Sequence, residues 1–231
     1  MNIHTIPTRQ ITWARTFRII RSIFPPIDLF EDIADPADWD ALASAEAKSN
    51  PRIVDQIGTL ALVPPERRVG GIGASYVMAP FTHVSTDRPG RFTDGSYGVY
   101  SAGDREEVAI YEVAYHHGRF MAATNEDSGW TAQFRMLIGS IDQLLHDLDG
   151  MAEMLLPHDW TQSQKTGAAL RAAGSNGVVY PSVRAPEGKC IGIFWPDLLP
   201  IPHQADHFDF HWNGAEVDKV RNCNSGKIFA L

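Results

Sequence analysis

The stretch GSNGVVYPSVR, residues 174–184, is the part of the sequence that most clearly indicates the fold class. Its first four residues form turns, and the next three are β-branched or aromatic, so they favour an extended strand. Residues 161–173, immediately before it, show a helical pattern that the glycine turn ends. The apolar run 190–195 follows after the turn at Glu187-Gly188, so a second strand is expected. Helix, strand, turn and strand in succession are typical of the α+β class.

The N-terminal half of the chain predicts a strand and helices separated by turns. Residues 15–21, RTFRIIR, alternate basic and apolar side chains, which predicts a short strand. Asp35-Pro36 predicts the start of a helix with the aspartate as its N-cap, and Asn50-Pro51 predicts its end. Residues 69–84 begin with glycines but lack the third glycine of a dinucleotide-binding loop, so a turn leading into a small-residue helix is expected. Residues 87–98 are turn-forming almost throughout.

One helix carries a carboxylate in an otherwise apolar and aromatic stripe. Asp104 is its expected N-cap, and two glutamates occupy its first turn. Spacings of i, i+3, i+4 and i+7 place four residues on one face, namely Val108, Tyr111, Glu112 and Tyr115. The neighbouring His116-His117 is expected to be a surface pair on this helix. Glu112 therefore stands out as a candidate for chemistry.

The C-terminal part predicts a hairpin. Residues 134–148 form a mixed apolar stretch, and the alternating residues Phe208, Phe210 and Trp212 then lead into Asn213-Gly214, a strong hairpin signal. Residues 216–231 are expected to form a C-terminal strand and a tail. The histidines at 203, 207 and 211 have the spacing of metal ligands on a helix. The local pattern is that of a strand, however, so no metal site is expected.

The composition excludes several classes of protein. The 231 residues include 20 Lys and Arg against 28 Asp and Glu, which gives a net charge of −8. Such a chain is repelled by a polyanion, so direct nucleic-acid binding is not expected, and an anionic ligand must be held by a few local arginines. The sequence has only two cysteines, and it lacks a signal peptide and a bilayer-spanning apolar stretch. We therefore expect one cytoplasmic domain over residues 1–231, without membrane contact.

Five scattered residues combine into a candidate site. Arg18 and Arg91 lie in turns or at strand ends, where a guanidinium group can bind phosphate oxygens bidentately. Tyr100 suits a planar ring beside a sugar, and the carboxylate of Glu112 can hold a ribose hydroxyl or stabilise oxocarbenium charge. For Ser182 as a nucleophile, no positioned His–acid pair can be inferred. Solvated surface arginines and a surface glutamate explain the same spacing, so both interpretations stay open.

The order of these residues is similar to that in the RES domain family, which is named for its Arg, Glu and Ser positions. The resemblance runs from about residue 15 to residue 215, on Phe17-Arg18-Ile19 with Pro25-Pro26, Gly90-Arg91-Phe92 with Gly98-Val99-Tyr100, Tyr111-Glu112-Val113, and 174–184. The chain resembles the longer subgroup of the family. The resemblance implies a single α+β domain with a mixed, mostly antiparallel sheet flanked by helices, similar to the ADP-ribosyltransferase fold.

The resemblance also implies the toxin of a bacterial toxin–antitoxin pair, whose partner is an Xre-type antitoxin. Family members degrade NAD+ by phosphorolysis or hydrolysis of the nicotinamide–ribose bond. NAD+ is therefore expected as substrate and inorganic phosphate as co-substrate, with no bound cofactor or metal. Carried over by position, Arg18 and Arg91 bind the phosphates, Tyr100 packs on the nicotinamide end, Glu112 engages the ribose, and Ser182 completes the pocket by a hydrogen bond.

Three further residues are candidate substrate-binding groups: Phe17, Phe92 and Gln164. Phe17 stands where many family members have tyrosine, and Thr93 stands where the shorter members have asparagine. Some members are described as ADP-ribosylating a protein, so mono-ADP-ribosyltransferase activity is an alternative. A non-catalytic module that binds an antitoxin is another, because charge pairing with a basic partner fits the net charge of −8.

Overall fold

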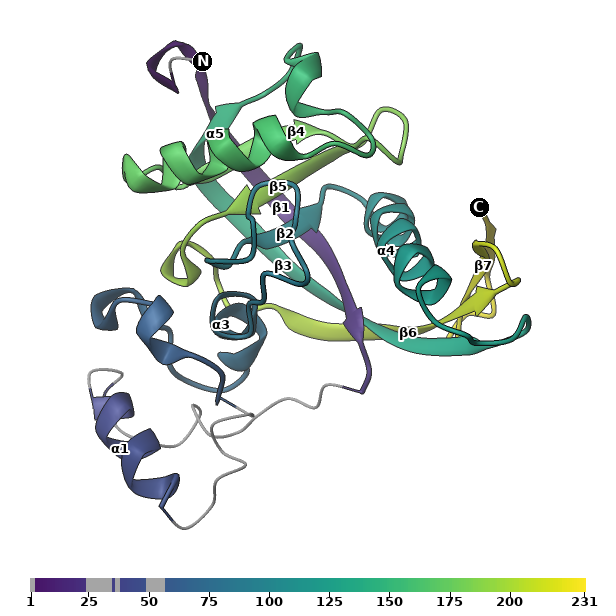
Figure 1. Cartoon of the computed structure of the whole chain (residues 1–231), viewed down its shortest axis with the longest axis horizontal. Coiled ribbons are helices and arrows are strands. Elements are labelled where there is room, and N and C mark those ends of the chain that lie inside the picture. The colour runs from purple at the N-terminus through teal and green to yellow at the C-terminus, as the bar shows by residue number, and fades with distance from the viewer. Residues whose placement is uncertain (1–2, 24–34, 36–37, 49–56) are drawn as a thin grey trace.

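Eight strands of one sheet run through the described part of the chain (Figure 1). The structure, a computed structural model, describes residues 3–23, 35, 38–48 and 57–231. The strands are β1 (Thr8–Arg21), β2 (Tyr100–Gly103), β3 (Thr131–Asp147), β4 (Gly177–Pro181), β5 (Lys189–Ile193), β6 (His203–Trp212), β7 (Val217–Asn222) and β8 (Ile228–Ala230). The α-helices are α1 (Trp39–Glu46), α3 (Ser75–Thr82), α4 (Glu106–Ala122) and α5 (Thr161–Ala172). Short 3-10 helices are η1 (Ile3–Thr5), η4 (Leu60–Leu62), η5 (Pro65–Arg67), η6 (Ala152–Met154) and η7 (Pro196–Leu198).

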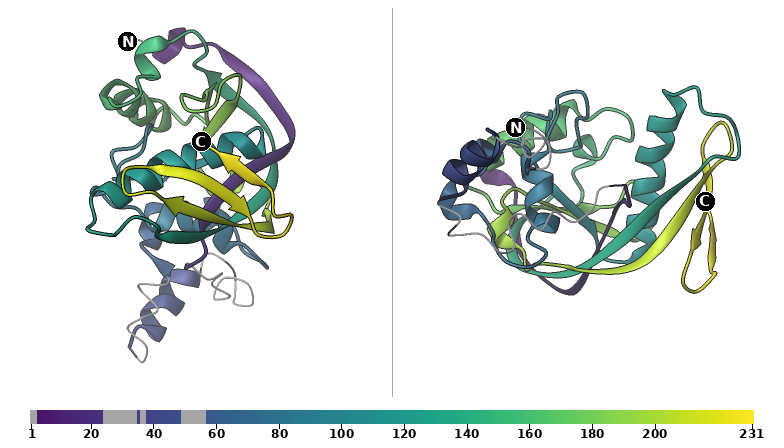
Figure 2. Two further views of the ribbon diagram at one scale, coloured as in Figure 1. Left: turned by 90° about the vertical axis from the view of Figure 1, so that its right-hand side faces the viewer. Right: turned by 90° about the horizontal axis from the view of Figure 1, so that it is seen from below.

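Strand β3 organises the sheet because it pairs with three other strands. It runs antiparallel to β1 along most of its length, antiparallel to β6 at its start, and parallel to β4 at its end. The strand order is β1-β2-β5-β4-β3-β6-β7-β8, and β1 also pairs with β3. Five strands therefore close into a ring, and β6, β7 and β8 extend beyond it (Figure 2). The predicted α+β class with a mixed, mostly antiparallel sheet is confirmed.

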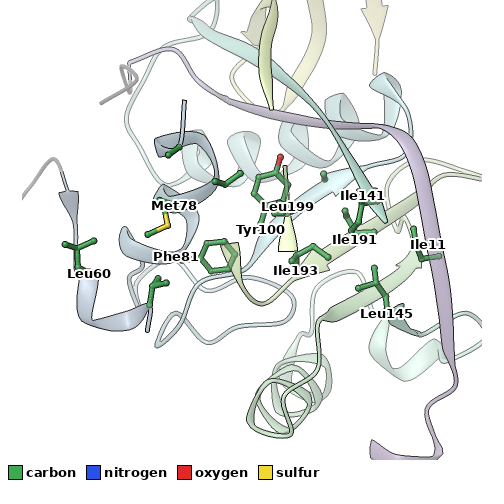
Figure 3. Close-up of a cluster of buried hydrophobic side chains, with 14 of the residues drawn as sticks. Ile11, Leu60, Met78, Phe81, Tyr100, Ile141, Leu145, Ile191, Ile193 and Leu199 are labelled. Carbon is green, nitrogen blue, oxygen red and sulfur yellow. The ribbon is translucent and has the colours of Figure 1, made fainter. Parts of the chain in front are cut away.

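The ring of strands packs around the first apolar cluster (Figure 3). Every strand of the ring contributes to it, with Ile11, Tyr100, Ala102, Ile141, Leu145, Val179, Ile191 and Ile193 all buried. Met78 and Phe81 of α3 complete the cluster. Because burial of apolar area is the main driving force of folding, this cluster holds the closed sheet together.

Helix α4 lies between the other two apolar clusters. Ala109 and Ile110 pack with Phe208 of β6 in the second cluster. Val108 belongs to the third cluster, which also contains Leu170 of α5 and side chains of β4 and β5. Helix α4 is therefore fixed on both sides of the stripe that carries Glu112.

The elements around 174–184 are as predicted. Helix α5 ends at Ala172, one residue before the predicted end, and β4 and β5 follow as a hairpin-like antiparallel pair. The turn-to-helix segment 69–84 and the hairpin at Asn213-Gly214 are confirmed as well, with α3 in the first and the β6–β7 pair around the second.

The predicted strand 15–21 was too short. Strand β1 begins at Thr8, because residues Thr8 to Trp13 pair with His146 to Ile141 of β3. The partner strand β3 covers most of the stretch 134–148, for which the mixed apolar pattern had predicted no particular element. The prediction of one C-terminal strand was also wrong, since both β7 and β8 lie in 216–231.

Two predicted helix starts were wrong. Helix α4 begins at Glu106 with Arg105 as N-cap, because the backbone N–H of Asp104 donates to Lys189 O of β5 at 2.9 Å. Helix α1 begins at Trp39, and its N-cap, Asp38, makes no side-chain capping bond. The predicted starting Pro36 and the predicted end at 50–51 lie outside the described residues.

Leu145→Ala is expected to lower the free energy of unfolding by about 2–5 kcal/mol, because it leaves a cavity inside the ring. Leu145 is fully buried, whereas the adjacent Leu144 is 51% exposed. Leu144→Ala is the matched control, with an expected change within about 0.5 kcal/mol. Urea denaturation followed by circular dichroism measures both, and equal losses would contradict the placement of Leu145.

Candidate functional site

A hydrogen bond between Ser182 and Glu112 forms the centre of the candidate site. Helix α4 carries Glu112, and Ser182 directly follows β4. The Ser182 hydroxyl donates to Oε1 of Glu112 at 2.7 Å and accepts the backbone N–H groups of Arg184 at 3.2 Å and Ala185 at 3.0 Å. Because a hydroxyl has one hydrogen to donate, these bonds fix its direction. Oε2 of Glu112 makes no hydrogen bond within the described residues, so it can face a ligand.

Buried neutral side chains flank this carboxylate. Cys190 is 3% exposed, and its thiol lies 3.7 Å from Oε1 of Glu112. Burial, followed by the negative charge of Glu112, raises the pKa of Cys190 well above its usual value. Burial also raises the pKa of Tyr180 well above its usual value. Both groups therefore stay protonated near neutral pH and add no charge beside Glu112.

Arg91 brings positive charge to the same region. Its Nη1 donates to the main-chain oxygens of Met154 at 3.2 Å and Leu156 at 3.0 Å. Burial lowers the pKa of Arg91, while its electrostatic interactions with Tyr180 and with the Glu112 carboxylate oppose that shift. Since an arginine stays protonated in proteins, Arg91 is a cation that attracts the Glu112 carboxylate electrostatically.

The turn that carries Arg91 is held by α5. Gln164 Nε2 donates to Gly90 O at 3.0 Å and to Thr93 O at 3.3 Å. Helix and turn also approach closely at Gly167, where an added Cβ would lie 2.4 Å from Phe92 O. The amide of Gln164 therefore positions the turn that carries Arg91. The sequence had instead suggested a contact between Gln164 and the substrate.

A cavity of about 250 Å³ opens beside Arg91. Phe92 and Tyr180 line it, and their rings meet edge-on with centroids 4.9 Å apart. The segment 80–88 and Ser101 of β2 contribute the facing walls. Tyr180 also interacts electrostatically with Glu112.

Arg18 and Tyr100 form a separate pair. The guanidinium carbon of Arg18 lies 4.8 Å from the centroid of the Tyr100 ring, and its Nη1 donates to Ser101 O at 2.8 Å. Tyr100 is 2% exposed and belongs to the cluster inside the ring. Burial lowers the pKa of Arg18 and raises that of Tyr100. Among the described residues no hydrogen bond or ion pair joins this pair to the Glu112 group, and its link to the cavity is the shared Ser101.

Phe17 lies elsewhere. It lines a wider cleft of about 940 Å³ between β1, β3, β6 and the first turn of α4. Neither Arg91 nor Glu112 lines that cleft. The candidate site residues are therefore distributed over three places, with Glu112, Ser182, Arg91 and Phe92 together.

Sequence reasoning missed three residues near the Glu112 group, namely Arg119, Trp160 and Arg184. Arg184 stacks on the Tyr115 ring, with its guanidinium carbon 3.4 Å from the centroid, and its Nη2 donates to Pro157 O. Arg119 lies 5.2 Å from the Trp160 centroid. Arg184 ends the stretch 174–184, where it could have been singled out. No sequence signal marked Arg119 and Trp160, because their meeting depends on how the segment before α5 lies against α4.

The expectation of a surface pair at His116-His117 was wrong for His117. His117 is 5% exposed and packs edge-on against Phe134, with ring centroids 5.0 Å apart. Desolvation, followed by the positive charge of Arg21, lowers its pKa to about 4. His116 is exposed as expected, but its ring lies 5.5 Å from the Trp160 ring.

Two further expectations concern metals and membranes. His203, His207 and His211 all lie on strand β6, so they do not stack as they would on a helix. The described residues contain no group of three or more His, Cys, Asp or Glu side chains placed to hold a metal ion. In the same part of the chain no helix is long and apolar enough to cross a membrane.

The chain belongs to the RES domain family, whose model matches residues 65–213. The uncharacterized protein y4oC of Sinorhizobium fredii is 24% identical over 202 residues, which cover 87% of this chain and 84% of that protein. A chain in the crystal structure of the M. tuberculosis MbcT–MbcA toxin–antitoxin complex is 12% identical, with 90% of each chain covered and a TM-score of 0.47. The family assignment agrees with the resemblance on which the site residues were predicted.

Gly167→Ala is expected to destabilise the protein by about 1–3 kcal/mol, because its methyl group would displace the Arg91 turn. Gly118→Ala on α4 is the matched control. An added Cβ there meets Val217 N at 3.7 Å, an ordinary contact. Higher helix propensity should then stabilise this variant by up to about 1 kcal/mol. Thermal unfolding measures both, and effects of the same sign would contradict the close approach at Gly167.

Stability should fall as the pH drops from about 6.5 towards about 4, because His117 binds a proton readily only in the unfolded chain. The folded pKa of about 4 sets the lower end of this window. His117→Gln should remove about 1–3 kcal/mol of the pH dependence of unfolding. His203→Gln, at an exposed position, is the control. Urea denaturation at about pH 6.5 and about pH 4 measures the free energy of unfolding of both variants. An unchanged pH dependence in the His117 variant would contradict this assignment.

Proposed function

We propose that this protein is an NAD+-degrading enzyme that cleaves the nicotinamide–ribose bond and acts in the cytoplasm as the toxin of a toxin–antitoxin pair. The observation that carries the proposal is the Ser182–Glu112 hydrogen bond. Arg91, which interacts electrostatically with Glu112, also lines a cavity. Membership of the RES domain family supports the proposal.

The reaction needs a group that stabilises positive charge on the ribose. When the C–N bond breaks, its electron pair leaves with neutral nicotinamide, and the ribose becomes oxocarbenium-like. Glu112 can stabilise that charge, or hold a ribose hydroxyl, through the oxygen that Ser182 leaves free. Phosphate or water then adds to C1 of the ribose. The products are ADP-ribose 1-phosphate in the first case, and ADP-ribose with release of a proton in the second.

Ser182 acts on the reaction through Glu112. Its hydroxyl is oriented by two backbone N–H groups, so it presents its hydrogen to the carboxylate continuously. A prepositioned carboxylate needs no reorganisation when charge develops on the sugar. The buried Cys190 side chain excludes water from one side of the carboxylate, which strengthens its interaction with a cation.

Glu112→Gln is expected to reduce nicotinamide release from NAD+ by about 100-fold or more, because the amide cannot stabilise the developing charge. Ser182→Ala should reduce nicotinamide release less, by about tenfold, since it removes the bond that orients the carboxylate and leaves the carboxylate itself in place. Glu107→Gln, on the first turn of the same helix, is the control and should stay within about twofold. Mass spectrometry of the products with and without phosphate identifies the acceptor. No turnover by the wild-type chain, or equal turnover by the Glu112 variant, would contradict the proposal.

The same bond cleavage can deliver ADP-ribose to a protein. Acid-precipitable label from NAD+ labelled in the adenylate half, on addition of cell extract, identifies that outcome. The proposed partner is an Xre-type antitoxin. Co-purification with a small helix-turn-helix protein encoded beside the gene, together with loss of NAD+ turnover in the complex, is the expected result for that pair.

A further inference from the structure

Three arginines from three different elements gather around two aromatic rings. The Trp160 centroid lies 5.2 Å from the guanidinium carbon of Arg119 and 6.0 Å from that of Arg91. The Tyr115 centroid lies 3.4 Å from that of Arg184 and 5.9 Å from that of Arg119. Arg119 lies on α4, Arg91 in the turn before β2, and Arg184 after β4. The fold therefore brings together charges that are far apart in the sequence.

Carboxylates do not neutralise this arginine group. Within the described residues no ion pair joins Arg91, Arg119 or Arg184 to an aspartate or glutamate. This contrasts with the net charge of −8 of the whole chain. A positive region in an acidic protein attracts a small anion locally while the rest of the surface repels polyanions.

His116 lies beside the same arginine group. Its ring lies 5.5 Å from Trp160. Although the residue as a whole is exposed, its ring packs against Tyr115 and Trp160. Desolvation of this ring, followed by the charges of Arg184, Arg119 and Arg91, lowers the pKa of His116 to about 4. The histidine therefore adds no positive charge near neutral pH, and a ligand there meets the guanidinium groups alone.

Two buried donors in this group lack a partner. Nε of Arg184 and Nε1 of Trp160 are shielded from solvent and have no hydrogen-bond acceptor in the described part of the chain. Other donors of the group are already used to hold the segment that leads to Trp160: Arg91 Nη1 binds Met154 O and Leu156 O, and Arg184 Nη2 binds Pro157 O. An acceptor that enters the arginine group could satisfy both donors.

We propose that Arg91, Arg119 and Arg184 form a polyphosphate subsite and that Trp160 stacks the nucleobase of the same ligand. The chemical class of ligand is a nucleoside diphosphate group. Arg119 follows Glu112 by seven residues on α4, which is about 10 Å along the helix axis. A dinucleotide can span that distance, so its pyrophosphate and base reach this subsite while its other ribose lies at Glu112. This inference rests on the proposed function and assigns binding residues to it.

The test is calorimetric binding of ADP-ribose, which needs no turnover. We expect Arg119→Gln to weaken ADP-ribose binding by about tenfold or more, the usual effect of losing a charge-assisted contact. Arg67→Gln is the matched control, because Arg67 also lies over an indole ring, 4.7 Å from the Trp195 centroid, outside this group. It should bind within about twofold of wild type. Binding of nicotinamide riboside, which has no phosphate, should be equal in all three proteins.

A second measurement tests the stacking. ADP-ribose should quench tryptophan fluorescence in the wild-type chain, and Trp160→Leu should abolish that quenching while its circular dichroism spectrum is retained. Absence of ADP-ribose binding to the wild-type chain, or equal affinity in the Arg119 variant, overturns the inference. NAD+ turnover that persists with unchanged KM in Arg119→Gln leaves the proposed function standing and rejects the subsite. ADP-ribose binding without any NAD+ turnover leaves the subsite standing and rejects the proposed function.

Discussion

The pairing of β1 with β3 is the interaction on which the rest of the structure depends. It joins residues Thr8 to Arg21 to residues Phe134 to His146, so segments more than a hundred positions apart lie side by side. Without it, the sheet would be open, with β1 as an exposed edge strand. Closure of the ring buries the first apolar cluster and leaves the outer face of β4 and β5 for α4 and α5. The candidate site lies on this outer face.

The site follows from that arrangement. Helix α4 supplies a carboxylate, the segment after β4 supplies the hydroxyl that orients it, and α5 fixes the turn that carries Arg91. An acidic chain that binds an anion must concentrate positive charge somewhere. The sequence interpretation placed that charge on Arg18 and Arg91, whereas the structure groups Arg91 with Arg119 and Arg184 and binds Arg18 to Ser101 O. Arg18 therefore contacts β2, through Ser101 O and the Tyr100 ring.

Much of the local structure could be predicted from the sequence because its signals are local. The glycine turn at 174–177, the alternation over 208–212 and the Asn213-Gly214 turn each depend on a few adjacent residues, and each led to the right element. The boundaries of β1 and the start of α4 could not be predicted, because strand pairing across the chain sets them. The same limit applies to the site. Glu112 and Ser182 were recognised by their positions in family motifs, but the burial of His117 and the meeting of Arg119 with Trp160 arise only from packing.

A crystal structure of the Glu112→Gln variant with bound NAD+ tests the central claim most directly. The account predicts the nicotinamide ribose beside residue 112 and Ser182, with the pyrophosphate among Arg91, Arg119 and Arg184 and the adenine on Trp160. The dinucleotide in the cleft beside Phe17, or with its phosphates on Arg18 and away from the Arg91 group, would contradict it.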